Sequence, residues 1–299
     1  MTRTRLIALS ALTALTIAGC GSEGDSGHQA KVVATTNVWG SVATAVAGGH
    51  ADVTSILTNP AADPHSYEAT PADAAAIADA TLVVINGGGY DHWADDVLAD
   101  HKNATTVNAY SLLPHSAAGE ANEHVFYNMA VAKAVAAKIA DDLAGADPAH
   151  ADAYRANATE FGKQTDAIAA TERAIGQKHP GAAVVATEPV AHYLLAAAGV
   201  TDSTPHGFAA AAEDGHDPAP ADVAAMLDLI NGHKVDALVV NKQTETAVTR
   251  QLQDAANKAA LPIVEVTETL PAGQDFLTWQ RQTAEALAHQ LDTAPVAAR

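Results

Sequence analysis

The chain has 299 residues, enough for one large or two medium-sized domains. Its formal net charge of −19 makes it a poor partner for nucleic acid and is typical of a soluble body that meets cations. The chain holds a single cysteine, which excludes an internal disulfide.

The first twenty residues resemble a bacterial lipoprotein signal. Two arginines precede an apolar run from Leu6 to Ile17, which is shorter than the roughly 20 residues of a membrane-spanning helix, and small residues lead into Cys20. We predict that residues 1–19 are a signal peptide, that the Cys20 thiol carries lipid, and that residues 20–30 form a flexible tether. The body would then be lipid-anchored at the cell membrane, on its extracytoplasmic face. A simple secretory signal with an incidental cysteine is the alternative.

Short β-branched runs alternate with helical patterns along residues 31–147. Thr70 followed by Pro71 is typical of a helix N-cap with proline at the first helical position. The alternation predicts an N-terminal βα lobe, with a parallel sheet and helices on both of its faces. The predicted strands are 31–35, 51–57, 81–86 and 104–107, and the predicted helices are 38–47, 71–80 and 127–143.

A long polar helix over residues 148–176 is predicted to link this lobe to a C-terminal βα lobe over residues 177–299. Its sequence is Ala-rich and has no proline after the first position, so it would form a rigid spine. Ser203 to Ala219 is predicted to be a polar loop. The predicted strands of the second lobe are 182–187, 237–240 and 263–266, and its predicted helices are 189–198, 220–230, 246–259 and 276–291.

The predicted fold class is therefore α/β, with two βα lobes, mainly parallel sheets and one long rigid helix that joins them. In open sheets of this kind ligands bind beyond the carboxyl ends of the strands. Two such lobes predict a ligand cleft between them.

Four side chains stand at positions that would face this cleft. His65 follows the second predicted strand, His124 precedes the helix 127–143, and Glu188 and Glu268 each come directly after a strand of the second lobe. Two imidazoles and two carboxylates would offset the charge of a divalent ion and fill a four- to six-coordinate site. Taken singly, His65 is also interpretable as a solvated loop histidine, and Glu188 as a carboxylate at a helix start.

Several stretches resemble the solute-binding proteins of bacterial zinc and manganese ABC importers. They occur in that family's order from Lys31 to the C-terminal helix: ATTNVWGSVATAVAGG, DPHSYEATPADAAAIADATLVVINGGGYDHW, EHVFYNM, ATEPVAHYLLAAAGV and NKQTETAVTRQLQDAANKAALPIVEVTETLPAGQDFLTW. The resemblance implies two lobes joined by one helix, and delivery of the metal to an ATPase-driven membrane permease. It also implies that the metal ligands are His65, His124, Glu188 and Glu268.

The chain departs from the zinc-type pattern of that family at three points. Glu188 stands where histidine is frequent, Glu268 stands where aspartate is usual, and a long His-rich loop between the first two ligands is missing. Because the fourth position carries the longer side chain, Glu268 is the ligand that the resemblance supports least.

Other polar side chains compete for roles near the site. Asn241 and Gln243 end a predicted strand, where they would either orient a ligand carboxylate or cap a loop. His92, after three consecutive glycines, is another candidate for contacting the ligands. His206 and His216 lie in the predicted polar loop, and the sequence leaves open whether this loop assists metal capture.

The interpretation that these observations favour is a monomeric transport receptor, not an enzyme, for one divalent transition metal ion. A secreted metallohydrolase and a surface adhesion lipoprotein are the alternatives. The sequence contains no HExxH motif, four protein ligands would close the coordination sphere, and aromatic residues are few. Two carboxylates lean toward manganese or ferrous iron, whereas zinc outbinds manganese in the usual affinity order, so zinc and manganese both stay open.

Overall fold

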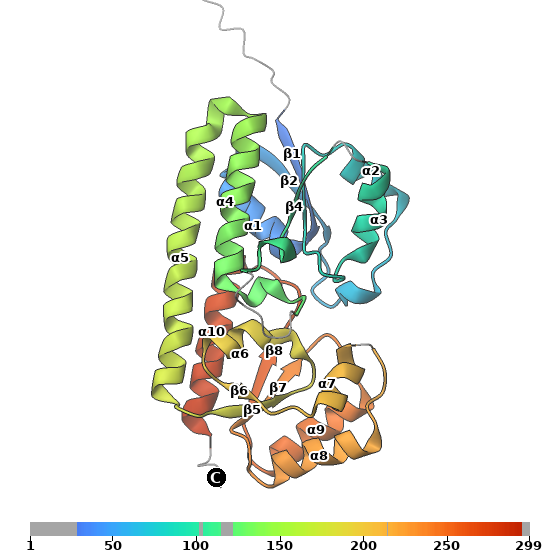
Figure 1. Ribbon diagram of the computed structural model, residues 1–299, viewed down its shortest axis with the longest axis vertical. Coiled ribbons are helices and arrows are strands. Elements are labelled where there is room, and N and C mark those ends of the chain that lie inside the picture. The colour runs from blue at the N-terminus through green and yellow to red at the C-terminus, as the bar shows by residue number, and fades with distance from the viewer. Residues whose placement is uncertain (1–28, 102–103, 115–121, 214, 295–299) are drawn as a thin grey trace, which may run out of the picture.

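The computed structural model describes residues 29–101, 104–114, 122–213 and 215–294. Cys20, the predicted signal peptide and almost all of the predicted tether lie outside the described residues. Two α/β lobes lie one above the other, and a long helix runs along one side of both (Figure 1). The predicted fold class is confirmed.

The first lobe is built on a four-stranded parallel sheet with the strand order β2-β1-β3-β4. Leu82 of the third strand packs with the cluster on one face, and Val83 packs with the cluster on the other, because successive side chains of a strand point to opposite faces. Helices cover both faces, as the sequence predicts. The elements are β1 (Ala30–Thr36), α1 (Asn37–Ala47), β2 (Ala51–Leu57), α2 (Pro71–Ala78), β3 (Leu82–Ile85), α3 (His92–Asp100), β4 (Thr105–Asn108) and α4 (Met129–Ala146).

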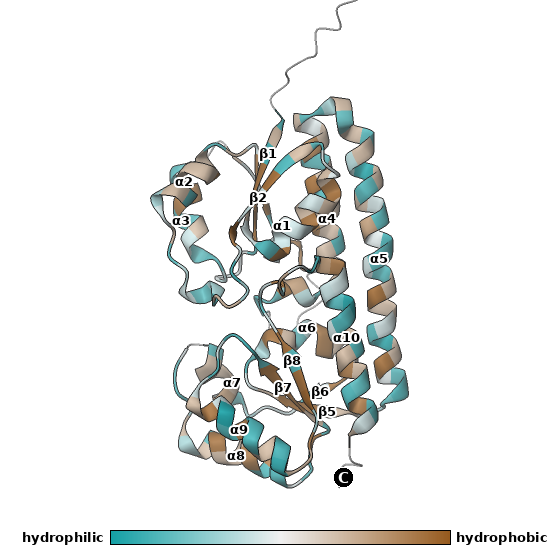
Figure 2. Cartoon of the chain, turned by 180° about the vertical axis from the view of Figure 1, so that it is seen from behind, coloured by the Kyte–Doolittle hydropathy of each residue, from teal (hydrophilic) through white to brown (hydrophobic). Residues whose placement is uncertain are grey.

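The second lobe repeats this plan with the strand order β6-β5-β7-β8, and its strands are again parallel. All five residues of its strand β7 are buried, and Figure 2 shows this strand as hydrophobic and the outer helix α9 as largely hydrophilic. The elements are β5 (Ala183–Ala186), α6 (His192–Ala197), β6 (Thr201–Asp202), α7 (His206–Glu213), α8 (Pro220–Asn231), β7 (Ala237–Asn241), α9 (Ala247–Lys258) and β8 (Ile263–Val266).

Two helices tie the lobes together. Helix α5 (Ala151–Lys178) has 28 residues, about 42 Å at the usual rise, and runs past both lobes. Helix α10 (Phe276–Thr293) also crosses the junction, because Phe276 stacks on Trp39 of the first lobe with ring centroids 6.4 Å apart. One buried apolar cluster therefore continues from the first sheet to the second, and the connection does not depend on α5 alone.

The prediction that Ser203–Ala219 is a polar loop is wrong, because this segment contains helix α7. Pro205 accepts the first hydrogen bonds of this helix, an alanine run continues it, and the buried ring of Phe208 anchors it to the second lobe. The sequence reading also missed helix α3 and the short strand β6. Among the described residues, no helix combines the length and the apolar character needed to cross a membrane.

Candidate metal centre

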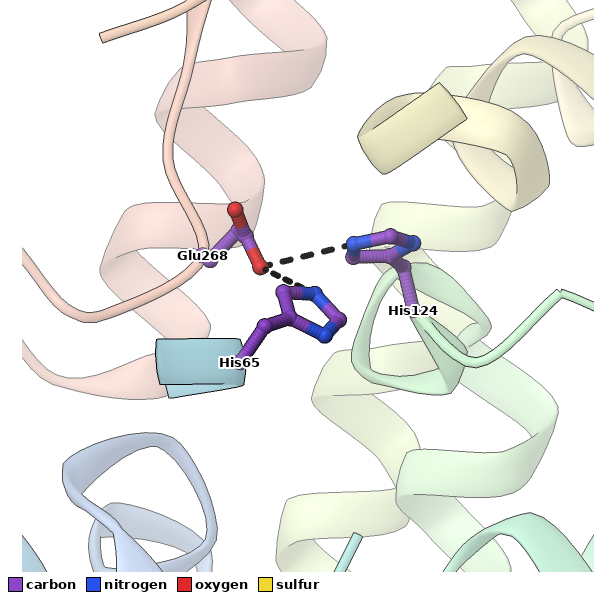
Figure 3. Close-up of side chains that lie close together, drawn as sticks. All are labelled: His65, His124 and Glu268. Carbon is purple, nitrogen blue, oxygen red and sulfur yellow. Dashed lines mark ion pairs between the residues drawn. The ribbon is translucent and has the colours of Figure 1, made fainter. Parts of the chain in front are cut away.

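Three of the four predicted ligands come together between the lobes (Figure 3). The Nε2 atoms of His65 and His124 lie 3.2 Å and 3.4 Å from the Oε2 atom of Glu268. One candidate ligand atom from each of the three residues lies within 4.8 Å of the others. Over the part of the chain that the structure describes, no other set of three His, Cys, Asp or Glu side chains meets this criterion.

Short turns fix the two histidines. His65 lies in a 3-10 turn, Pro64–Ser66, whose start is capped by the Asp63 carboxylate accepting a hydrogen bond of 2.9 Å from the His65 backbone. His124 immediately precedes a second 3-10 turn and is almost fully buried, whereas the His65 side chain is about one-third exposed. One histidine is thus held at the open side of the cluster and the other on its inner side.

Tyr90 packs against both imidazoles and was not predicted from the sequence. Its ring centroid lies 4.8 Å from that of His65 and 5.7 Å from that of His124, both with edge-on geometry. A tight turn after β3 brings it there: Gly87 has a positive φ of 75°, and a Cβ on it would lie 2.2 Å from Asn108. Three consecutive glycines at a strand end were the sequence signal for this turn.

The turn is closed by the buried carboxylate of Asp91. It accepts hydrogen bonds from the backbone N–H groups of Asn86 and Gly87 at 2.7 Å and 2.8 Å, and from the Thr35 hydroxyl at 2.6 Å. Three donors satisfy this buried charge, so the Asp91 side chain holds the segment that carries Tyr90 against the end of the sheet.

The loop that carries Glu268 is bound by the first lobe although it follows a strand of the second. The hydroxyl of Tyr127 donates to the Thr267 carbonyl at 2.9 Å, and the hydroxyl of Tyr90 donates to the Glu268 carbonyl at 3.3 Å. Asn37 of α1 accepts a hydrogen bond of 3.1 Å from the Leu270 backbone. Glu268 is thereby held beside the two histidines by groups that belong to the same lobe as they do.

The three side chains change one another's charge state. Burial alone would raise the pKa of Glu268, but the adjacent His124 and His65 outweigh it and hold that pKa far below its usual range. Burial lowers the pKa of His65, but Glu268, with Glu123 and Asp63 behind it, outweighs burial and raises that pKa above its ordinary value. Glu268 is therefore a stable anion, and it attracts positive charge to this point.

The Oε2 atom of Glu268 is buried, and apart from its two ion-pair contacts with the imidazoles no donor among the described residues makes a hydrogen bond with it. A buried carboxylate oxygen in that condition is costly unless a proton or a cation balances it. Its nearest neighbours are the two imidazole nitrogens, both of which are metal-binding atoms when neutral. The donor set thus fits a divalent transition metal ion.

Glu188 lines the same cavity but is outside the three-residue cluster. One of its oxygens accepts from the Thr244 hydroxyl and the other from the Asn241 amide, which also donates to Glu268 Oε1 at 2.8 Å. Burial raises the pKa of Glu188, and so does Glu268, although the two hydrogen bonds oppose this. Asn241 therefore bridges two carboxylates that would otherwise repel each other.

The structure places the remaining candidates, Gln243, His92, His206 and His216, at different distances from the cluster. Gln243 lies beside the cluster, because its side chain accepts a hydrogen bond from the Glu268 backbone. His92 is exposed at the start of α3 and is not among the residues that line the cavity. His216 lines the outer part of the cavity, and His206 is exposed at the start of α7.

The cavity has a volume of about 470 Å³ and is open on one side. His65, His124 and Glu268 lie in its wall, and the buried side chain of Phe208 from α7 also lines it. Acidic side chains surround it, namely Asp63, Glu123, Glu188, Glu213 and Asp217. Such a surface favours cations over anions.

Comparison with known proteins supplies the family. The manganese-binding lipoprotein MntA of Halalkalibacterium halodurans is 29% identical over 155 residues, which cover 50% of this chain and 51% of that protein. This match thus spans about half the length of the relative. The manganese ABC transporter substrate-binding lipoprotein PsaA of Streptococcus pneumoniae is 23% identical over 304 residues, 94% of this chain and 96% of that protein.

The fold has solved counterparts, among them the periplasmic zinc-binding protein TroA of Treponema pallidum. The TM-score is 0.75 at 17% sequence identity, and the match covers 88% of this chain and 99% of that structure. The family model described as zinc-uptake complex component A, periplasmic, matches residues 32–290. With nearly all of both lobes matched, this chain belongs to the family of periplasmic zinc-uptake component A proteins.

Proposed function

We propose that this protein is the solute-binding lipoprotein of an ABC importer, which captures one divalent transition metal ion and hands it to a membrane permease. The observation that carries the proposal is the buried Glu268 Oε2 atom, which faces two imidazole nitrogens and has no other hydrogen-bond donor among the described residues. A metal ion among these three atoms satisfies the carboxylate and uses both nitrogen lone pairs.

The ligand set that we propose is His65, His124, Glu268 and Glu188. The first three are already gathered, whereas Glu188 lies outside this group and is hydrogen-bonded by Thr244 and Asn241. Two nitrogens and two carboxylates accept either zinc or manganese, with ferrous iron as a third choice. Membership in a zinc-uptake family and likeness to a manganese-binding lipoprotein support this range of metals.

Transport requires no nucleophile and no general base, so we propose that the protein is not an enzyme. A metallohydrolase would need an open coordination position and a base beside the metal. Metal analysis of the purified protein, paired with a broad hydrolase screen, separates the two functions: one ion per monomer with no turnover supports the receptor.

The test of the site compares two pairs of histidine variants. His65→Ala and His124→Ala are expected to weaken binding of zinc and manganese at least ~10-fold, the scale on which even supporting residues act. His150→Ala and His289→Ala, on the surface away from the cavity, are expected to bind like the wild type. Equal losses in all four variants, measured by competition with a chromogenic chelator, contradict the assignment.

The anchor is tested separately, because Cys20 lies outside the described residues. Cys20→Ala is expected to move the protein from the membrane fraction to the medium while leaving the metal dissociation constant unchanged. A variant that stays in the membrane fraction contradicts anchoring through this thiol.

A further inference from the structure

Asn122 binds the His124 side chain from two residues away. Its Oδ1 atom accepts a hydrogen bond of 2.9 Å from the His124 backbone and lies 2.9 Å from the His124 Nδ1 atom. Asn122 is 5% exposed, so water does not compete freely for these contacts. The contact ties the buried imidazole to its own turn on the side away from Glu268.

The hydrogen bonds around the Asn122 amide decide which atom of His124 carries its proton. The amide nitrogen donates to the Glu213 carboxylate at 3.3 Å, which leaves Oδ1 as the atom that faces the imidazole. Since Oδ1 only accepts, its contact with Nδ1 favours the neutral tautomer with the proton on Nδ1, against the competing pull of the Glu268 carboxylate on Nε2. The lone pair then belongs to Nε2, the atom that faces Glu268.

Two side chains of the second lobe hold Asn122 in place. The Tyr193 hydroxyl, on helix α6, donates to the Asn122 carbonyl at 2.8 Å and accepts from its backbone N–H at 3.2 Å. Glu213, at the end of α7, accepts from the Asn122 amide. All three bonds cross from one lobe to the other, so they exist only while the lobes keep this arrangement.

We propose that Asn122 is a positioning residue for metal capture, which presets the Nδ1–H tautomer of His124. Tyr193 and Glu213 hold Asn122 from the second lobe, so this choice of tautomer depends on the two lobes being close together. His124 is thus ready to bind metal in the closed arrangement. When the lobes separate, Asn122 loses its contacts with the second lobe and no longer holds His124 firmly. The inference rests on the proposed function, because it concerns the same site.

The expected size of the effect follows from the chemistry of such contacts. A metal-binding imidazole commonly donates its other N–H to an oxygen acceptor, and loss of that acceptor typically costs 10- to 100-fold in metal affinity. Without Asn122 the neutral ring is free to place its proton on Nε2, which blocks the lone pair toward the metal. Each binding event then includes the unfavourable change of tautomer.

The central experiment compares Asn122→Ala with the double variant Asn122→Asp/Glu213→Gln. The alanine variant removes the acceptor and is expected to weaken zinc and manganese binding about 10- to 100-fold. The double variant keeps an oxygen toward His124 and restores a donor–acceptor pair with residue 213, so affinity within about threefold of the wild type is expected. Asn157→Ala, a half-buried asparagine that donates to the Val46 carbonyl at the far end of α5, is the matched control.

Two further readouts separate positioning from a general loss of structure. The visible absorption of bound Co²⁺ is expected to change in Asn122→Ala and to match the wild type in the double variant. Nitrogen-15 NMR of the metal-free protein is expected to show the His124 Nδ1–H signal in the wild type and the double variant only. Tyr193→Phe is expected to lower affinity about threefold with the Co²⁺ spectrum unchanged.

The inference is overturned if Asn122→Ala binds metal as tightly as the wild type, or if the double variant binds as weakly as Asn122→Ala. Unchanged affinity in Tyr193→Phe overturns the coupling to the second lobe. His124→Ala distinguishes these outcomes from failure of the proposed function. If that variant also binds normally, the metal site itself is misassigned. If it loses binding, only the role of Asn122 is wrong.

Discussion

The Gln243 side chain of the second lobe donates a hydrogen bond of 2.9 Å to the backbone carbonyl of Ala62, three residues before His65. The same amide nitrogen lies 2.8 Å from the Thr269 hydroxyl, and the amide oxygen accepts from the Glu268 backbone. One side chain therefore holds the backbone on both sides of the three-residue cluster. It joins the loop of His65 to the loop of Glu268, two of the proposed ligands.

Gln243→Ala is therefore expected to weaken metal binding about 10-fold, because two ligand loops lose a common support. Gln253→Ala is the matched control, since that half-buried side chain is away from the cavity and has a 3.5 Å contact with Glu245. Isothermal titration of the metal-free proteins with zinc and manganese provides the comparison. Identical dissociation constants for the wild type and Gln243→Ala would show that His65 and Glu268 are positioned without this bridge.

Glu188 is the second position to test, because its carboxylate lines the cavity but is bound by Thr244 and Asn241. Glu188→His is expected to raise the preference for zinc over manganese, since nitrogen ligands suit zinc and carboxylates suit manganese. Glu188→Gln is expected to weaken both metals, because it removes a negative charge. The ratio of the two dissociation constants is the measurement, with the exposed Glu245→Gln as control. If neither variant changes ratio or affinity, Glu188 is not a ligand.

The pH dependence of metal binding follows from the raised pKa of His65. Only the neutral imidazole binds metal, so protons compete as pH falls through that raised pKa, whereas Glu268 stays ionised because its pKa is lowered. Apparent affinity is expected to fall about tenfold per pH unit once His65 is protonated, which begins above the ordinary histidine value of about 6.5. Titrations at pH 8, 7, 6 and 5 measure it. A constant affinity from pH 7.5 to 5.5 is incompatible with a histidine ligand.

The contribution of His65 to the stability of the metal-free protein is expected to change with pH in the opposite direction. The contribution of His65 to stability is complete below the unfolded pKa of about 6.5 and is lost as pH rises through its raised folded value. The contribution of Glu268 is present above about pH 4.5 and is lost only as pH falls through its lowered folded value. The increase in melting temperature caused by saturating metal should therefore grow from pH 5 to pH 8.

Local sequence patterns predicted the scaffold well because each βα unit carries its own signals. The predicted strand 81–86 contains the apolar run Leu82–Ile85, which forms β3 just before three glycines, and Thr70 caps α2 as predicted, within a capping box. The polar segment 203–219 misled the prediction, because the apolar residue that anchors α7 is a single phenylalanine, Phe208. One buried ring among polar and small residues gives no helical periodicity.

His65 and Glu268 were predicted from strand ends, His124 from its place before a helix, and all three from family resemblance, but the residues that support them were not predicted. Asn122 meets Tyr193 across 71 positions of sequence, and Tyr127 meets Thr267 across 140. No local pattern encodes such pairs, because they exist only after both lobes have folded and packed. His92 illustrates the converse, since its place after three glycines suggested the site, yet the turn points Tyr90 inward and leaves His92 exposed.

Glu172 is a buried carboxyl in the C-terminal part of the linking helix α5 and does not line the cavity. It is 1% exposed, and its Oε1 atom makes no hydrogen bond with any described residue. Burial raises its pKa to about 7, and the neighbouring Arg173 only partly opposes this. Between about pH 4.5 and 7 the folded protein therefore holds a proton that the unfolded chain releases.

This proton makes the stability of the metal-free protein fall as pH rises, because a carboxyl with a raised folded pKa is destabilising once it ionises. The loss is expected to reach up to about 3 kcal/mol by pH 8, at ~1.4 kcal/mol for each unit between the two pKa values. Glu172→Gln keeps the shape and never ionises, so its free energy of unfolding should lack this loss and exceed that of the wild type above pH 7. Urea unfolding at pH 5 and pH 8 tests this, with Glu160→Gln, an exposed carboxylate of the same helix paired with Lys163, as the control.

If Glu172→Gln and the wild type lose stability in parallel between the two pH values, Glu172 does not titrate in this range. The linking helix would then tolerate the buried carboxylate through solvent access that the packed structure lacks.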